Sequence, residues 1–321
     1  MGAALALGER GRGRTAPNPN VGCVIVKEGR VVGRGWTQPG GRPHAEAMAL
    51  AEAGAQSRGA TCHTTLEPCA HRSTRGPTCS DLLIEAGVAR AVAALGDPDP
   101  RTNGAGVERL RAAGIAVTVG LRADDARRSM AGFLTRWTFG RPHVTLKLAV
   151  SLDGCIALAL GESRWITGPA SRAHAHLERA RHEAILVGRG TWEADAPKLD
   201  VRLPGLEDRS PRRVVLTSGA LGESGSWTTI PSPQAIADLP AVDHLLIEGG
   251  ASTAAAFLRA DLVDRLLLYR APIMIGGGLP AIDDIGLTDL STAHGRWRPH
   301  DARGLGEDRL EVYERTPCSP A

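Results

Sequence analysis

Four side chains that can do chemistry occur at suggestive spacing near the start of the chain. His44 and Glu46 are separated by one residue and open a helical pattern, Cys69 directly follows Pro68 after an apolar run, and Cys79 begins a further helical pattern. One imidazole and two thiolates suit a tetrahedral Zn²⁺ that keeps its fourth position for water, as catalytic zinc sites do. The spacing therefore predicts a catalytic zinc bound by His44, Cys69 and Cys79.

Glu46 is the free carboxylate beside these ligands. Zinc lowers the pKa of bound water to about 7. Because Glu46 is not needed as a ligand, it can take the proton from that water and pass it to a departing amine. A His-x-Glu pair followed by Pro-Cys and a second Cys is typical of zinc enzymes that deaminate nucleobases. We predict that Glu46 is the catalytic acid and base of a hydrolytic deamination.

The spacing between the cysteines departs from the short form of this motif, because residues 70–78 separate them. A loop is therefore inserted between the two ligands. His71 lies in the loop and is either a substrate contact or, alternatively, a replacement metal ligand. On the simplest structural interpretation, His44 is a surface histidine and both cysteines are inert. The combination of Glu67-Pro68-Cys69 with a second Cys at a helix start favours the metal site.

The first part of the chain alternates strand-like and helix-like patterns, which is typical of an α/β domain. A Gly-Arg-Pro sequence at residues 140–142 then breaks the last helical pattern, because proline cannot extend a helix. We place the domain boundary there, between 1–139 and 140–321. The expected strands are 21–26, 31–35, 60–66, 88–95 and 115–119, and the expected helices are 45–53, 80–86, 107–113 and 123–139.

The same alternation resumes beyond the boundary, so we expect a second α/β domain. The segment 191–212 is rich in Pro, Asp and Arg, shows little periodicity and is expected to be a long functional loop. The expected strands are 144–150, 185–187, 213–216, 244–247 and 265–271, with helices over 171–181 and 253–260.

A glycine-bearing turn follows the apolar run 244–247 and precedes the helical pattern that begins near Thr253. Glycines at such a turn let backbone amides approach a phosphate, and the helix dipole favours an anion there. The turn, Glu248 to Ser252, is a candidate dinucleotide cradle, although it lacks the G-x-G-x-x-G pattern of a Rossmann fold. An ordinary turn is the alternative, and for Gly276 to Gly278 it is the favoured interpretation.

Composition narrows the function further. The chain has 321 residues, 42% of them apolar, and a formal net charge of +3. Such a chain buries enough surface to fold without a structural metal, and the small charge argues against a nucleic-acid partner. We find neither an apolar run long enough to span a membrane nor a secretory signal. We therefore expect a cytoplasmic enzyme that acts on a small molecule. The scattered cysteines are expected to be reduced: Cys23, Cys62, Cys69, Cys79, Cys155 and Cys318.

Several motifs follow one another in a fixed order along the chain. They are Asn18-Pro-Asn-Val-Gly22, His44-Ala-Glu46, Thr65-Leu-Glu-Pro-Cys69, Lys147 to Gly154 and Trp165-Ile-Thr-Gly168. In this order they resemble the family of bifunctional riboflavin-biosynthesis deaminase/reductases. The resemblance implies a cytidine-deaminase-like α/β/α domain over 1–139 and a dihydrofolate-reductase-like α/β domain over 140–321. It also implies a phosphorylated pyrimidine nucleotide as substrate, Zn²⁺ and NADPH as cofactors, and a homo-oligomer, a dimer or tetramer.

Matched motif positions carry family roles over to this chain. The reaction implied is hydrolytic deamination of 2,5-diamino-6-(5-phosphoribosylamino)pyrimidin-4-one, followed by reduction of the ribosyl group to ribityl. The positions implied to hold the nicotinamide cofactor are Ala149, Trp165, Thr191, Asp195, Gly250, Ala251, Ser252 and Thr253. Those implied to hold the phosphorylated substrate are Ser163, Arg179, Leu199, Arg202 and Glu248. Arginine forks suit a phosphate, and a carboxylate can accept hydrogen bonds from ribose hydroxyls.

Three alternatives stay open at this point. The chain could be a nucleic-acid or nucleotide deaminase whose C-terminal domain only binds, although 3% aromatic residues argue against single-strand binding. It could be a non-catalytic protein with structural zinc. It could also be a bifunctional enzyme with one inactive half, since Thr37, Cys62 and His63 depart from the expected family residues. Lys147 is either a packed strand residue or a contact of the substrate carbonyl.

Overall fold

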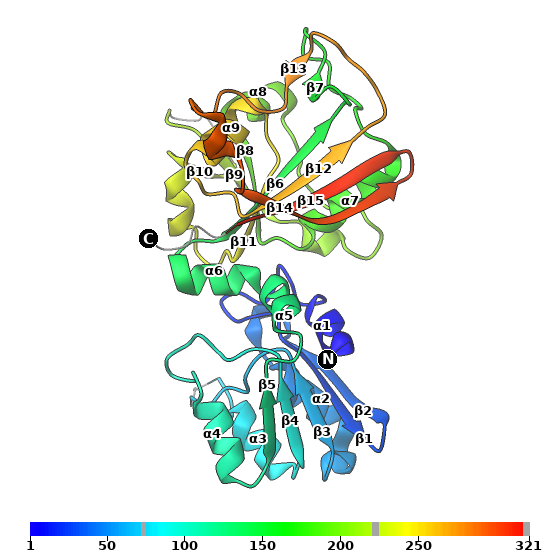
Figure 1. Cartoon of the computed structure of the whole chain (residues 1–321), viewed down its shortest axis with the longest axis vertical. Coiled ribbons are helices and arrows are strands. Elements are labelled where there is room, and N and C mark those ends of the chain that lie inside the picture. The colour runs from blue at the N-terminus through cyan, green and yellow to red at the C-terminus, as the bar shows by residue number, and fades with distance from the viewer. Residues whose placement is uncertain (72–74, 220–224, 317–321) are drawn as a thin grey trace. The chain divides into compact units, whose positions relative to one another are not determined.

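The computed structural model describes residues 1–71, 75–219 and 225–316. The chain divides into two compact units, Met1–Gly140 and Arg141–Ala321, each with its own sheet (Figure 1). Gly140 belongs to the first unit because it caps the helix before it with a left-handed backbone, φ 68°. The division thus falls one residue after the expected boundary. Cys318 lies outside the described residues, and the five described cysteines are free and buried.

The described part of the first unit contains a five-stranded sheet in the order β2-β1-β3-β4-β5. β1 pairs antiparallel with β2 and β3, whereas β3, β4 and β5 run parallel. The strands are β1 Gly22–Lys27, β2 Arg30–Trp36, β3 Thr61–Thr64, β4 Arg90–Ala93 and β5 Ala116–Val119. The helices are α1 Gly2–Gly8, α2 Ala45–Ala53, α3 Cys79–Glu85, α4 Ala105–Ala112, α5 Ala123–Ser129 and α6 Ala131–Phe139, with 3₁₀ turns at Pro39–Gly41 and Gly54–Ser57.

Two glycines of β2 let helix α2 approach the sheet closely. A Cβ atom on Gly33 would lie 2.1 Å from the carbonyl oxygen of Ala49, and one on Gly35 would lie 2.1 Å from that of Ala45. No side chain fits in that space, so the helix backbone packs directly on the strand. The close approach places the first turn of α2, which contains Glu46, against the sheet.

The predicted helix over 123–139 is wrong in one respect, because the structure divides it into α5 and α6. The break falls at Met130, whose backbone has φ −102° and ψ 21° and whose side chain is fully buried. The apolar periodicity continues through the break, so the sequence pattern does not reveal it.

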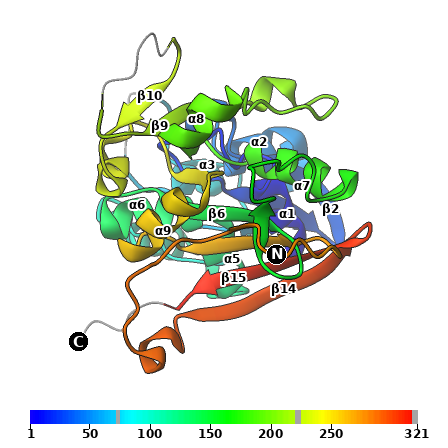
Figure 2. The ribbon, with the colours of Figure 1, turned by 90° about the horizontal axis from the view of Figure 1, so that it is seen from above.

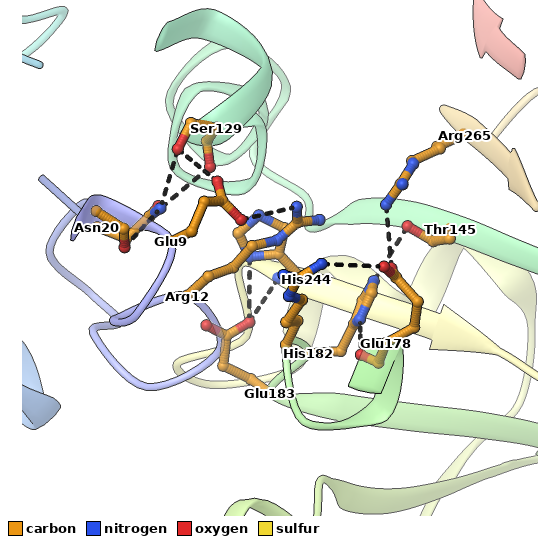
Figure 3. A network of polar contacts seen from close by, with 12 residues as sticks. Glu9, Arg12, Asn20, Ser129, Thr145, Glu178, His182, Glu183, His244 and Arg265 are labelled. Atoms are coloured by element: carbon orange, nitrogen blue, oxygen red, sulfur yellow. Dashed lines mark hydrogen bonds and ion pairs between the residues drawn. The ribbon is translucent and has the colours of Figure 1, made fainter. Parts of the chain in front are cut away.

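Polar side chains join the end of α5 to the N-terminal segment of the first unit. The Ser129 hydroxyl donates a hydrogen bond to Glu9 Oε1 over 2.6 Å, and the Asn20 amide donates to the Ser129 carbonyl over 3.2 Å (Figure 3). Asn20 is 3% exposed, so these bonds satisfy a buried polar group. The bonds hold the Asn18–Gly22 segment, which leads into β1.

The described part of the second unit contains an eight-stranded sheet in the order β10-β9-β8-β11-β6-β12-β15-β14, and a separate pair, β13-β7. The neighbouring strands β10-β9-β8-β11-β6-β12 all run parallel to one another. The antiparallel β14–β15 hairpin lies at one edge of the sheet (Figure 2). The strands are β6 His143–Val150, β7 Cys155–Ala157, β8 Ala184–Gly188, β9 Arg212–Leu216, β10 Thr228–Ile230, β11 His244–Ile247, β12 Arg265–Arg270, β13 Leu279–Pro280, β14 Trp297–Leu305 and β15 Asp308–Arg315. The helices are α7 Pro169–Arg179, α8 Arg189–Asp195 and α9 Ala251–Arg259, with 3₁₀ turns at Glu207–Arg209, Pro233–Asp238 and Leu290–Ala293.

The alternation of β6 separates the core from the functional face of this sheet. Leu146 and Leu148 are buried in an apolar cluster with Phe257 of α9. The residues between and after them, Lys147 and Ala149, point to the opposite face because successive side chains of a strand alternate. The strand therefore builds the core on one side and presents Lys147 on the other.

A buried histidine ties the end of α7 to β6. His182 Nδ1 donates to the Glu178 carbonyl over 2.6 Å, and its Nε2 lies 3.1 Å from the Thr145 hydroxyl. The Glu178 carboxylate in turn pairs with Arg265 of β12 at 3.1 Å (Figure 3). These buried contacts fix α7 relative to the sheet.

One expectation for the second unit needs correction, and one feature of this unit was not predicted. The segment 191–212 is not one long loop, because α8 extends through its first residues and a 3₁₀ turn covers Glu207–Arg209. The β14–β15 hairpin was not predicted, since the exposed pattern of β14 carries no apolar alternation. At Gly278 a Cβ atom would lie 2.3 Å from the Ala157 carbonyl oxygen, so this glycine has a packing role.

Candidate active sites

His44, Cys69 and Cys79 converge in the first unit. His44 is the residue before α2, and Cys79 is the first residue of α3. His44 Nδ1 lies 3.2 Å from Cys79 Sγ and 3.6 Å from Cys69 Sγ. The three ligand atoms all lie within 4.8 Å of one another, which suits a shared metal ion. One nitrogen and two sulfurs form the donor set of a catalytic zinc site with an open fourth position.

Asn18 orients the imidazole, a role that the sequence analysis did not assign. Its side-chain amide lies 3.0 Å from His44 Nε2 and also donates to the Gly41 carbonyl over 3.0 Å. With Nε2 held in this way, Nδ1 faces the two sulfurs. Such partners of a metal-binding histidine fix its tautomer and ring orientation.

The two cysteines differ in their readiness to lose a proton. Hydrogen bonding from Cys79 holds the pKa of Cys69 well below its ordinary value, and the same interaction with burial raises the pKa of Cys79. The backbone N–H of Cys79 also donates to Cys69 Sγ over 3.3 Å. A thiolate is the form that binds metal, so the fold prepares Cys69 as a ligand.

Glu46 lies directly beside these ligands and is 3% exposed. Thr64, the last residue of β3, donates to Glu46 Oε1 over 3.1 Å, and the Cys79 thiol donates to Oε2 over 3.2 Å. Burial raises the pKa of Glu46 above the ordinary value for a carboxyl group. A carboxyl group with a raised pKa is better able to both accept and return a proton near neutral pH.

Glu67 positions a second set of acidic side chains around the same site. Its buried carboxylate accepts hydrogen bonds from the backbone N–H groups of Asp97, Gly104 and Val107 at 3.0–3.2 Å. This clamp shapes the Asp-Pro-Asp-Pro segment, whose second aspartate, Asp99, receives the forked guanidinium of Arg101 at 2.5–3.0 Å. The sequence analysis missed this acidic pair; the signal was a polar Asp-Pro repeat directly after an apolar strand.

These side chains line a cavity of about 450 Å³ in the first unit. Burial, together with the negative charges of Asp99 and Glu67, raises the pKa of Asp97 to about 6. Apolar side chains, acids and arginines therefore share one pocket, as in many small-molecule sites. The lining includes Asn18, Arg42, His44, Glu46, Leu66, Cys69, His71, Arg75, Cys79, Asp97, Asp99, Arg101, Phe133, Arg136 and Trp137.

His71 contacts the same polar segment rather than the cysteines. Its Nδ1 lies 3.0 Å from the Thr102 hydroxyl. His71 is outside the group of three ligands that the described residues bring together. The geometry favours the substrate-contact alternative for His71 over the replacement-ligand alternative.

In the second unit, the neighbouring parallel strands β8, β11 and β6 bring the expected cofactor residues to one edge of the sheet, the edge formed by the carboxyl ends of these strands. Gly188 ends β8, and a Cβ atom there would lie 2.1 Å from Thr253 Oγ1 of α9. A Cβ atom on Gly250 would lie 3.8 Å from Thr191 Oγ1 of α8, so those two segments are also neighbours. Gly250 is the N-cap of α9, where backbone amides and the helix dipole can hold a phosphate.

Most of the other expected cofactor residues are near this edge. Asp195, the last residue of α8, pairs with Arg164 at 3.2 Å. Trp165 follows Arg164 and is 65% exposed, and Ser163, expected at the substrate, precedes it and is also exposed. Ala149 lies in β6 beside Tyr269 of β12. The loop before α7 and helix α8 thus flank the same sheet edge.

The expected substrate residues Arg179 and Glu248 form a mostly buried ion pair. Arg179 Nε and Nη2 donate to the two carboxylate oxygens of Glu248 at 2.8 and 2.9 Å. Lys147 Nζ lies 3.6 Å from Glu248 Oε2, which supports the functional interpretation of this lysine. Burial by itself would raise the pKa of Glu248, but Lys147 and Arg179 lower it to about 2. Glu248 is therefore a permanent carboxylate near neutral pH.

Leu199 and Arg202 lie on the loop that passes the end of α7. Leu199 is 6% exposed and packs with Ile185, Val187 and Leu246. Arg202 is mostly exposed, with Nε 3.5 Å from Asp200 Oδ1. The structure thus brings this loop, Arg179 and Glu248 together.

The fold and the two sites define a class of protein: a two-unit α/β enzyme with a zinc-deaminase type of site and a second site suited to a dinucleotide and a phosphorylated substrate. Residues 1–95 match the model of the cytidine and deoxycytidylate deaminase zinc-binding region. Residues 142–309 match the model of the RibD C-terminal domain. These matches confirm the predicted two-domain α/β fold class.

The chain belongs to the RibD family of riboflavin biosynthesis proteins. It is 39% identical to the riboflavin biosynthesis protein RibD of Escherichia coli over 355 residues, with 96% of each chain covered. It matches the structure of Acinetobacter baumannii RibD, form 1, with a TM-score of 0.86, 36% identity and coverage of 99% and 98% of the two chains. A Thermotoga maritima structure, described as a diaminohydroxyphosphoribosylaminopyrimidine deaminase/5-amino-6-(5-phosphoribosylamino)uracil reductase, matches with a TM-score of 0.87, 33% identity and coverage of 98% and 97%.

Family membership confirms that the chain is a bifunctional deaminase and reductase that uses Zn²⁺ and NADPH. The match to the reductase model does not support a C-terminal domain that only binds. It acts on a small molecule, and among the described residues no helix is both long and apolar enough to cross a bilayer.

Proposed function

We propose that the first unit hydrolytically removes an amine from 2,5-diamino-6-(5-phosphoribosylamino)pyrimidin-4-one. The observation that carries this proposal is the convergence of His44 Nδ1 and the sulfurs of Cys69 and Cys79 within 4.8 Å, with the Glu46 carboxylate in contact. When bound there, Zn²⁺ supplies a water of lowered pKa. The Thermotoga maritima neighbour carries the name of this deaminase activity, which supports the choice of substrate.

The side chains of the cavity have distinct tasks in this proposal. Glu46 takes a proton from the attacking water at Oε2 or Oε1 and returns it to the departing amine, which its raised pKa favours. Asp97 and Asp99 face the cavity and can accept hydrogen bonds from the amino groups of the pyrimidine. Arg42 and Arg75 line the same cavity and offer forked donors to the phosphate. Glu67, which also lines the cavity, positions the aspartate segment through its hydrogen bond from the Asp97 backbone N–H.

We propose that the second unit reduces the ribosyl group of 5-amino-6-(5-phosphoribosylamino)uracil to ribityl. When bound, NADPH supplies the hydride. The amides at the N-terminus of α9, Gly250 to Thr253, hold a cofactor phosphate, and Thr191 and Asp195 of α8 flank it. This placement is supported by the sheet edge that these segments share.

The Lys147, Arg179 and Glu248 cluster orients the sugar in this proposal. Glu248 is held as a carboxylate and can accept hydrogen bonds from ribose hydroxyls. Lys147 Nζ, 3.6 Å from Glu248, is available to donate to the carbonyl oxygen of the opened sugar. Arg202, mostly exposed on its loop, offers a fork to the phosphate.

We also propose that the enzyme works in the cytoplasm as a homo-oligomer. The five free, buried cysteines of the described residues are typical of a reducing compartment. Large apolar side chains are exposed in the second unit, among them Leu160, Met274 and Leu290, and self-association would remove such side chains from water. Light scattering of the purified protein would measure the assembly, and a purely monomeric mass would contradict it.

One assay tests the two activities together. The diaminopyrimidine nucleotide and NADPH are supplied to the purified protein, and ammonia release and nicotinamide absorbance are followed in parallel. We expect ammonia release followed by NADPH oxidation. After removal of metal by a chelator, we expect ammonia release to stop, while NADPH oxidation on the deaminated nucleotide continues. Ammonia release that is insensitive to complete metal removal would contradict the zinc mechanism.

A further inference from the structure

Two side chains of α7 hold the main chain of the neighbouring loop. The carbonyl oxygen of Asp200 lies 3.0 Å from Arg179 Nη1 and 3.1 Å from His176 Nδ1. The backbone nitrogen of Arg202 lies 3.3 Å from the same Nδ1 atom. His176 is one turn before Arg179 on the helix, so both side chains face the loop. The sequence analysis assigned no role to His176.

The other anchors of this loop leave Arg202 dependent on His176. Leu199 is buried, and the Val201 backbone N–H donates to the Ser210 hydroxyl over 3.0 Å. The side chain of Arg202 is 62% exposed, and its Nε lies 3.5 Å from Asp200 Oδ1. Within this set of contacts, the bond to His176 is the one that reaches the backbone of Arg202 itself.

The His176 ring acts here as a neutral group. Burial, followed by the positive charges of Arg179 and Arg202, lowers the pKa of His176 below its ordinary value. A neutral ring does not repel the guanidinium groups of Arg179 and Arg202. It therefore does not disturb a phosphate site formed beside them. Nδ1 bonds to the loop in either neutral tautomer, as a donor to the Asp200 carbonyl or as an acceptor from the Arg202 N–H.

We propose that His176 is a positioning residue of the reductase. Through Nδ1 it fixes the Asp200–Arg202 backbone, so that the Arg202 guanidinium is held where it binds the phosphate of the substrate. His176 itself touches neither substrate nor cofactor in this role. The inference rests on the proposed reductase function and adds a determinant of its preference for a phosphorylated substrate.

Three variants at this position separate the contact from simple packing. His176→Asn places an amide close to the position of Nδ1, and this amide can both donate and accept. His176→Gln keeps an amide but places it near the position of Nε2, one bond further from the backbone. His176→Leu keeps the approximate volume and removes the polar atoms. Circular dichroism and thermal unfolding establish that each variant is folded.

The measurement is steady-state NADPH oxidation by the full-length holoenzyme on the deaminated nucleotide and on the same compound without its phosphate. For His176→Leu and His176→Gln, we expect the KM of the phosphorylated compound to rise roughly tenfold, with kcat nearly unchanged, since a backbone contact of this kind is lost. We expect the KM of the dephosphorylated compound and that of NADPH to stay near the wild-type values. His176→Asn should restore most of the phosphate preference.

The result that would overturn the inference is an equal change for both compounds, or wild-type kinetics in the folded leucine variant. A glutamine variant that performs as well as wild type, with a defective asparagine variant, would also overturn it, because Nε2 would then be the relevant atom. Failure of the wild-type protein to reduce the deaminated nucleotide at all would instead contradict the proposed function. The two failures are therefore distinguishable.

Discussion

The Cys79 thiol donates a hydrogen bond to the carboxylate of Glu46, with 3.2 Å between sulfur and oxygen. A predicted metal ligand and the predicted acid–base carboxyl group are thus in direct contact. Both groups are buried, so the contact takes place in an environment of low dielectric constant, where it is strong. Thr64 holds the second carboxylate oxygen, which leaves Glu46 little freedom to rotate.

Replacement of Glu46 by Gln should separate the two activities. The amide keeps the shape of the side chain but cannot take a proton from water, so we expect ammonia release to fall by about 10²–10⁴-fold. NADPH oxidation on the deaminated nucleotide should be unchanged, and metal analysis should still find one zinc in the first unit. Loss of both activities in a folded variant would contradict two separate sites.

The close approach of α2 to β2 should be necessary for the metal site. A Cβ atom on Gly35 would lie 2.1 Å from the Ala45 carbonyl oxygen, so Gly35→Ala must displace the first turn of α2 and with it His44 and Glu46. We expect weaker zinc retention during dialysis and at least a tenfold loss of ammonia release, as misplacement by about 1 Å can cost 10²-fold. Val31→Ala, at an exposed position of the same strand, is the matched control. Normal zinc retention in Gly35→Ala would show that the packing is not required.

The forked ion pair of Arg179 should matter for its geometry as well as its charge. Arg179→Lys keeps the charge but loses the two-pronged contact with Glu248 and the contact with the Asp200 carbonyl. Because lysine cannot replace a bidentate guanidinium, we expect the KM of the reductase substrate to rise roughly tenfold or more. Arg181→Lys, which changes the 3.5 Å contact of a partly exposed guanidinium with the buried Glu178, is the control. Equal kinetics of the two variants would argue against this role of Arg179.

The cofactor cradle can be tested at Gly188. A Cβ atom there would lie 2.1 Å from Thr253 Oγ1, so Gly188→Ala must displace the hydroxyl of Thr253 in the first turn of α9. We expect the KM of NADPH to rise several-fold, with ammonia release unaffected. Gly190→Ala is the matched control, because a Cβ atom at that position meets no other atom within 4 Å. An unchanged KM in Gly188→Ala would place the cofactor elsewhere.

The low pKa of Glu248 predicts a pH dependence of stability. The folded state lowers this pKa from 4.5 to about 2, so it favours the carboxylate over the protonated form. The resulting stabilisation, roughly 3 kcal/mol at about 1.4 kcal/mol per pKa unit, is complete above pH 4.5 and disappears as the pH falls to about 2.

Glu248→Gln removes this titration. Calorimetric unfolding of wild type and variant across that pH window should therefore differ in the stability of the second unit. This difference should shrink as the pH falls. A difference that stays constant between pH 4.5 and 2 would contradict the depressed pKa of Glu248.

The sequence by itself indicated the donor set of the candidate metal site and the carboxylate beside it, and it determined the order of two α/β units. Those features depend on residue types and local periodicity, which are visible in one dimension. Local patterns also predicted α2 over its full extent, because its apolar residues and the following glycine are all nearby in sequence.

Only the tertiary structure decided which groups complete each site. Asn18 contacts His44, although the two residues are distant in sequence. Glu67 binds the segment that contains Asp97. Arg179 at the end of α7 pairs with Glu248, which follows β11. The sequence marked several of these residues only through family motifs, and nothing local in the sequence predicts which partner each of them meets. Their energies depend on burial and on distances of about 3 Å, and neither quantity exists until the strands and helices have packed.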